Sequence, residues 1–166
     1  MDAFYGVFAG ISLGLLGLWW VAMEAVGSSW FTDRGRYVVA TMVTHGFLFT
    51  GAMSLLSLAT TGPVAWRLAF LLGGGAGALS CARVLRYPDP VLRTVAPLWA
   101  SAGSLVLFIA IMVVAVVPSW PNSVAGRQIE SILFVSILVI GVLLAWNVLT
   151  FGLTNRAASA DSGDPH

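Results

Sequence analysis

Charged residues are scarce in this chain. They make up 9% of its 166 residues, whereas a soluble domain carries about 25%. Hydrophobic residues make up 58%, and the mean hydropathy is +0.92. A surface that faces water needs many more polar side chains than this composition supplies. We therefore expect the chain to lie in a membrane.

Lysine is absent, and cysteine occurs once, at Cys81. Without lysine the chain cannot form a retinal Schiff base or carry out pyridoxal chemistry. A single cysteine excludes an internal disulfide and any Cys-x-x-Cys redox or zinc motif. His45 is the only histidine in an apolar segment, so one chain cannot supply both axial ligands of a six-coordinate b-type haem. We expect neither a cofactor nor a metal site.

The sequence also lacks the patterns of common enzymes and of nucleic-acid-binding proteins. The glycine run that begins at Gly73 lies within an apolar segment and has no lysine after it, unlike a phosphate-binding loop. A nucleophile elbow for a Ser–His hydrolase is missing. A net charge of +1 without a basic patch argues against nucleic acid as a partner. An enzyme is therefore the least favoured class.

What the chain does contain is five apolar segments, which fill nearly its whole length. Their predicted bounds are 3–27, 37–60, 63–86, 95–117 and 129–153. A hydrocarbon core of about 30 Å needs about 20 residues of helix, and strands of an outer-membrane barrel would be half as long and alternating. The sequence predicts an all-α, polytopic transmembrane bundle over residues 1–154. A polar tail, 155–166, is expected to be disordered and cytoplasmic.

The third segment is the weakest of the five, because Arg67 and Arg83 lie inside its ends. Both side chains are long enough to extend along the helix and bring the guanidinium to the headgroups. The uninterrupted apolar run between them is residues 68–82. We still expect this segment to span the membrane.

The distribution of arginine predicts the orientation of the chain. With the amino terminus outside, six of the eight arginines fall on the cytoplasmic side, and only Arg67 and Arg127 fall outside. Cytoplasmic loops collect positive charge, so we expect an extracytoplasmic amino terminus and a cytoplasmic carboxyl terminus. The expected location is the cell (inner or plasma) membrane. Arginine without lysine, together with abundant Ala, Gly and Val, is typical of a GC-rich bacterial genome.

Glycines recur at a spacing that favours helix packing. Gly6, Gly10 and Gly14 follow one another every four residues, and a second group runs from Gly73 to Gly77. Helices in lipid associate through close van der Waals contact, which small residues permit. We expect these glycines to pack helices within one chain, with a homo-oligomer or another membrane protein as the alternative partner.

Ionisable residues inside the bilayer commonly indicate function. Glu24 lies about one turn from the end of the first segment, and His45 lies about two turns into the second, with Thr41 one turn before it. A glutamate and a histidine that face each other would affect each other's protonation, as in a proton relay or a cation site. Equally, Glu24 could reach the headgroups and His45 could bond to a backbone carbonyl or a threonine hydroxyl. Asn147 is expected to face the bundle interior.

Arg127 and Glu130 lie three residues apart at the start of the fifth segment. This spacing places them on one side of a helix, and we expect an ordinary solvated pair there.

Two classes of function remain. The first is a non-enzymatic membrane subunit or scaffold that packs through its glycine-rich helix faces. The second is a small, oligomeric transporter or channel in which Glu24, Thr41, His45 and Asn147 line a polar path. The lipid bilayer is the expected partner in both, and the sequence specifies no substrate.

Overall fold

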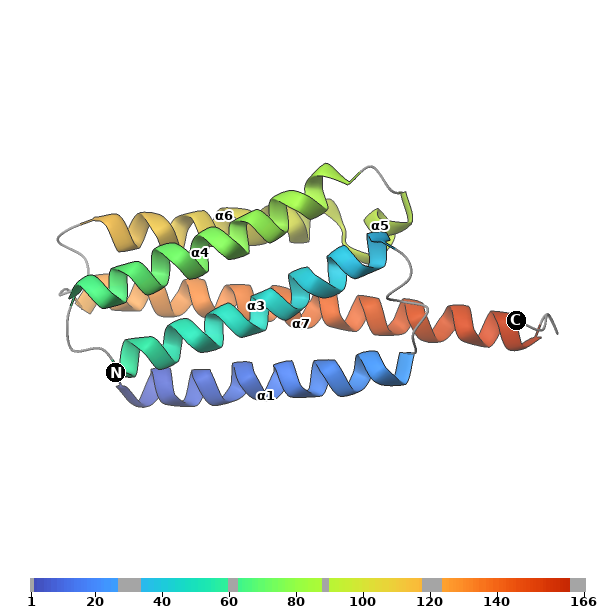
Figure 1. Ribbon diagram of the computed structural model, residues 1–166, viewed down its shortest axis with the longest axis horizontal. Helices are drawn as coiled ribbons and strands as arrows, with labels where there is room; N and C mark the ends of the chain where they lie inside the picture. The colour runs from blue at the N-terminus through green and yellow to red at the C-terminus, as the bar shows by residue number, and fades with distance from the viewer. Residues whose placement is uncertain (1, 27–33, 60–62, 88–89, 118–123, 162–166) are drawn as a thin grey trace.

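The computed structural model describes residues 2–26, 34–59, 63–87, 90–117 and 124–161. These residues form an all-helical bundle (Figure 1). Its helices are α1 (Asp2–Val26), α3 (Arg34–Ala59), α4 (Pro63–Arg86), α5 (Pro90–Val95), α6 (Leu98–Val116) and α7 (Val124–Asp161). The long helices run side by side and alternate in direction. We call the end where α1, α4 and α7 begin the N-terminal end of the bundle, and the opposite end the C-terminal end.

Five of these helices are long and apolar enough to cross a membrane. The candidate spans are Ala3–Ala25, Arg34–Ala59, Arg67–Arg86, Leu98–Val116 and Gln128–Phe151. The predicted helical class and the five apolar segments are therefore confirmed, with bounds that differ by a few residues. The predicted segment ends at residues 27 and 60 lie outside the described residues.

The fourth span begins later than predicted because Pro97 divides it from a short helix. Pro97 is the N-cap residue of α6, with an extended backbone (φ −60°, ψ 146°). Proline has no backbone N–H and disfavours helical geometry at the residue before it. Val95 and Ala96 are nevertheless buried, so the chain packs against the bundle before α6 starts.

α3 lies at the centre of the bundle. In its apolar window 56% of the residues are buried, against 28% in the windows of α1 and α7. It packs against α1, α4 and α7, and Val39, Val43 and Phe47 on it are almost fully buried. Among the described helices, α1 packs mainly on α3 and, less closely, on α7. One side of α1 is consequently left open.

Three phenylalanines from three helices form a stacked layer near the N-terminal end. Phe134 of α7 lies between Phe8 of α1, at 5.6 Å between ring centroids, and Phe70 of α4, at 5.4 Å. Phe70 and Phe134 are fully buried and Phe8 nearly so. Offset aromatic pairs at such separations are favourable beyond the area that they bury. This layer fixes the register of α1, α4 and α7 relative to one another.

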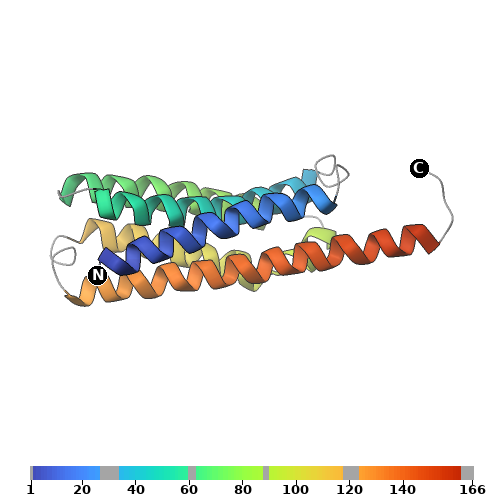
Figure 2. The same cartoon turned by 90° about the horizontal axis from the view of Figure 1, so that it is seen from below.

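α7 is much longer than a membrane crossing requires. Its 38 residues correspond to about 57 Å at 1.5 Å per residue, and Figures 1 and 2 show it extending beyond α1 and α4 at the C-terminal end. The tail therefore differs from the predicted disorder, because residues 155–161 continue α7. Alanines 157, 158 and 160 favour a helix. Residues 162–166 lie outside the described part of the chain.

Candidate functional site

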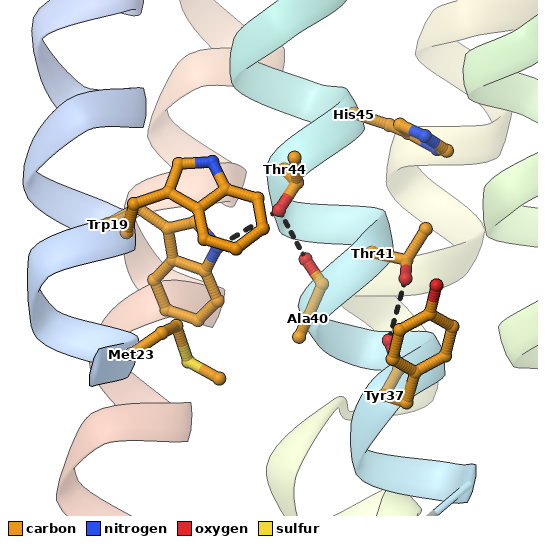
Figure 3. A pocket seen from close by; sticks show the side chains of 8 residues that line it. Trp19, Met23, Tyr37, Ala40, Thr41, Thr44 and His45 are labelled. Atoms are coloured by element: carbon orange, nitrogen blue, oxygen red, sulfur yellow. Dashed lines mark hydrogen bonds between the residues drawn. The ribbon is translucent and has the colours of Figure 1, made fainter. Parts of the chain in front are cut away.

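A pocket of ≈ 200 Å³ lies between α1 and α3, towards the C-terminal end of the bundle (Figure 3). It is partly open to the surroundings. Its lining residues are Trp19, Trp20, Met23, Tyr37, Ala40, Thr41, Thr44 and His45. Two predicted site residues, Thr41 and His45, thus belong to one site, and α1 supplies aromatic and apolar side chains opposite them.

The inner polar groups of the pocket are already hydrogen bonded. The Trp19 indole N–H donates to Thr44 Oγ1 at 3.1 Å, and the Thr44 hydroxyl donates to the Ala40 carbonyl at 2.9 Å. The Thr41 hydroxyl donates to the Tyr37 carbonyl at 2.8 Å. Figure 3 shows these bonds on the wall that α3 provides. The threonines therefore offer no donor to a ligand, and the pocket interior is largely apolar.

The rim of the pocket differs from its interior, because the polar groups of the rim are available to bind a ligand. Trp20 is 52% exposed and Tyr37 is 53% exposed. Neither the Trp20 indole N–H nor the Tyr37 hydroxyl has a hydrogen-bond partner among the described residues. Both rings have an apolar body and a polar edge, which suits the membrane–water interface. The rim thus presents two donors on amphipathic rings.

His45 connects α3 to α4 rather than to α1. Its Nδ1 lies 2.6 Å from Ser80 Oγ, and the Ser80 hydroxyl donates to the Ala76 carbonyl at 3.0 Å. Because that bond uses the only hydroxyl hydrogen of Ser80, the serine oxygen accepts from Nδ1–H. The neutral imidazole then keeps a lone pair on Nε2. The expected satisfied interior histidine is found, with Ser80 in place of a threonine as its partner.

Glu24 and His45 are not in contact. Glu24 is exposed, and between these two described residues there is neither a hydrogen bond nor an ion pair. Glu24 lies one turn beyond Trp20 on α1, and it is not among the residues that line the pocket. Coupling between the two groups, on which the transporter interpretation depends, stays a prediction.

Asn147 lies on α7 and is half-buried. The pocket is lined by α1 and α3, so the structure does not bring Asn147 together with Thr41 and His45. The backbone carbonyl of Asn147 accepts a hydrogen bond from the Thr150 hydroxyl at 3.1 Å. One turn further on, the Arg36 guanidinium of α3 lies over the Phe151 ring of α7, 6.0 Å from its centroid.

The two glycine groups have different surroundings. A Cβ placed on Gly73 would meet Met53 Sδ of α3 at 2.9 Å, and one on Gly77 would meet the Phe108 ring of α6, with Cζ at 2.5 Å. On α1, a Cβ on Gly6 would lie 3.8 Å from Leu58, and Gly10 and Gly14 have nothing within 4 Å. The α4 glycines therefore allow close helix contacts within the chain. Most of the α1 glycines do not.

Glu130 is the residue that the sequence interpretation placed wrongly. It is 1% exposed, so the expectation that its carboxylate is solvated is wrong, while its pairing with Arg127 stays a prediction. The Arg127 side chain lies outside the described residues. A signal was present, because Glu130 lies inside the predicted segment 129–153 and ionisable residues within a span face the interior. In the structure Glu130 shares the buried face of α7, whose members are Phe134, Ile137, Gly141, Leu144 and Val148. One turn before Phe134, this carboxylate occupies a core position.

The register of the phenylalanine layer indicates what surrounds Glu130. Tyr5 precedes Phe8 by three residues on α1, and Arg67 precedes Phe70 by three on α4, so both lie one turn towards the N-terminal end, as Glu130 does. Tyr5 is buried and the Arg67 Nε is buried. We call Tyr5, Arg67 and Glu130 the polar layer. It lies one helical turn from the phenylalanine layer, towards the N-terminal end of the bundle. Buried charges are stable in a bundle only when they are paired.

No protein family, curated protein or solved structure matches this chain. Within the described ranges, no group of three or more His, Cys, Asp or Glu side chains is placed to hold a metal ion. The fold and the composition define the class: an all-helical protein with five helices that can cross a membrane.

Proposed function

We propose that this protein is a non-enzymatic subunit or scaffold of the cell membrane and that α1 is its docking helix. The observation that carries the proposal is the open glycine face of α1, formed by Gly10, Gly14 and Gly17, none of which would place a Cβ within 4 Å of another group. These positions lie within 60° of one another on a helix with 100° per residue. The face is a groove with free space in front of it.

Glycine in a helix interior costs about 1 kcal/mol relative to alanine. On α4 this cost is offset by contacts with Met53 and Phe108 that no larger residue would allow. On α1 no such contact exists within the chain at Gly10, Gly14 or Gly17. A partner helix that approaches the α1 backbone closely would supply it. Val7, Ile11 and Leu18 stand exposed along one edge of the groove and would pack on that helix.

The docking proposal is tested by Gly10→Leu. Because a Cβ added at Gly10 would meet nothing within 4 Å, we expect the isolated chain to keep its thermal stability in detergent. Association should fall at least tenfold, since the leucine holds the partner helix away. The measurement is pull-down from native membranes in mild detergent with mass spectrometry of the co-purifying proteins, together with the mass of the complex.

Gly75→Leu is the matched control, because Gly75 on α4 also has nothing within 4 Å but lies outside the α1 groove. It should leave the co-purifying proteins unchanged. A self-associating chain or a different membrane protein would each fit the proposal. Equal recovery of the same assembly from the wild type and Gly10→Leu would contradict it.

The C-terminal end of the bundle is proposed to face the cytoplasm. Arg34 and Arg36 begin α3 there, Arg83 and Arg86 end α4, and Arg93 lies on α5. Arg67 lies near the opposite end. Because cytoplasmic loops collect positive charge, the larger number of arginines at the C-terminal end supports a cytoplasmic position for that end.

Reporter fusions test this orientation. A fusion after Asn155 should behave as cytoplasmic, and a fusion ahead of Asp2 should behave as extracytoplasmic. Activity of a periplasmic reporter after Asn155 would show that the orientation or the number of crossings is wrong.

A further inference from the structure

We infer that the pocket between α1 and α3 binds one phospholipid with a zwitterionic, primary-amine headgroup. Its acyl chain would lie between the helices, and its phosphate and ammonium groups would lie at the rim. This inference does not depend on the glycine groove of α1. It rests on the shape of the pocket, the state of its donors and the charges beside its mouth.

The shape of the pocket suits an acyl chain. Tyr37 and His45 are the first and last residues of its lining on α3, and the eight-residue step from one to the other corresponds to about 12 Å along the helix. The pocket therefore runs from the end of the span towards the middle of the membrane. Trp19, Met23 and Ala40 supply apolar surface, and the threonine hydroxyls beside them donate to backbone carbonyls. A hydrocarbon chain can enter such a groove without separating a buried polar group from its partner.

The rim suits the phosphate and ester oxygens of a lipid. The Trp20 N–H and the Tyr37 hydroxyl are exposed donors without partners among the described residues. Arg34 is exposed and lies three residues before Tyr37, so it is one turn nearer the end of the same α3 face. Arginine binds phosphate through several N–H groups at once. We expect these three donors, which come from two helices, to bind one phosphate.

We expect Glu24, one turn beyond Trp20, to supply the opposite charge. It lies four residues after Trp20 on α1 and is exposed. Between Glu24 and Arg34, both within the described ranges, no salt bridge is formed, and we expect each to meet a headgroup charge. A carboxylate would repel an anionic headgroup and attract an ammonium, and a primary ammonium adds hydrogen bonds that a quaternary one cannot make. This charge arrangement favours phosphatidylethanolamine over phosphatidylglycerol and phosphatidylcholine.

The inference is tested by lipid competition and native mass spectrometry. The full chain in mild detergent is given equal amounts of phosphatidylethanolamine, phosphatidylcholine and phosphatidylglycerol with identical acyl chains. We expect one retained lipid per chain and at least a fivefold excess of phosphatidylethanolamine over either competitor. Glu24→Gln, an exposed substitution that leaves the fold intact, should remove the excess over phosphatidylglycerol. Equal retention of all three lipids by the wild type would overturn the headgroup assignment.

A second pair of variants tests the pocket itself. Ala40→Trp fills it and should abolish the retained lipid, whereas Ala59→Trp, at an exposed position near the other end of α3, should not. Thr41→Phe also fills the pocket, at a lining position that is less buried than Ala40. It replaces Ala40→Trp in the test if that variant does not fold. Retention by both filling variants at the level of Ala59→Trp would overturn the site.

Discussion

Gly77→Leu is expected to destabilise the bundle by about 3 kcal/mol, the upper part of the range for an overpacked core. A Cβ at Gly77 would already fall on the Phe108 ring, 2.5 Å from Cζ, and Phe108 is itself 2% exposed. The ring has no free space into which it can turn, so α4 and α6 must separate. Thermal unfolding in detergent, followed by tryptophan fluorescence, measures the loss as a lower apparent Tm.

Gly75→Leu provides the control on the same helix. It adds the same side chain two residues away, where nothing lies within 4 Å, and it should shift the Tm only slightly. If both variants lost stability equally, the cause would be the helix or its insertion, and the close contact between α4 and α6 would not explain the effect.

Glu130→Leu is expected to cost about 3 to 5 kcal/mol, the range for removing one member of a buried charge pair. Glu130 is almost fully buried, and the register places Arg67 in the same polar layer with its Nε buried. We expect Glu130 to be the counter-charge of Arg67, so that without the carboxylate the guanidinium stays in an apolar environment unpaired. The free energy of unfolding in detergent is the quantity to measure.

A double-mutant cycle separates this charge effect from a simple loss of packing. Combined Arg67→Leu and Glu130→Leu should be less destabilising than the sum of the single changes, by about 0.5 to 3 kcal/mol, because the double variant leaves no isolated charge. Glu24→Leu, which removes an exposed carboxylate, should change stability little. Strict additivity of Arg67→Leu and Glu130→Leu would mean that the two residues do not interact.

The spans could be predicted from the sequence because their cause is local. A run of about 20 apolar residues must be helical in lipid to satisfy its backbone, so the five segments follow from composition alone. The rotation of each helix is a different problem. Both the lipid-facing and the interior sides of these helices are apolar, so no amphipathic period shows which side is buried. That is why Ser80 was not foreseen as the partner of His45, although both residues were visible in the sequence.

The glycines illustrate the same limit. Gly10 and Gly14 repeat every four residues, and so do Gly73 and Gly77. The first pair faces open space and the second faces Met53 and Phe108. Spacing indicates that a helix can be approached closely, but only the position of its neighbours decides what approaches it. Glu130, by contrast, could have been placed, since it lies inside the predicted segment 129–153, where a carboxylate faces the interior of a bundle.

The stacked phenylalanines have a consequence for how the protein is made. Phe134 lies on α7, which leaves the ribosome after α1 and α4, and it fits between Phe8 of α1 and Phe70 of α4. Until α7 has been synthesised, the nascent chain carries two aromatic surfaces with no ring between them. The bundle can therefore complete this layer of its core only after α7 has left the ribosome. A chain that stops before residue 134 would be a ready substrate for membrane chaperones and proteases.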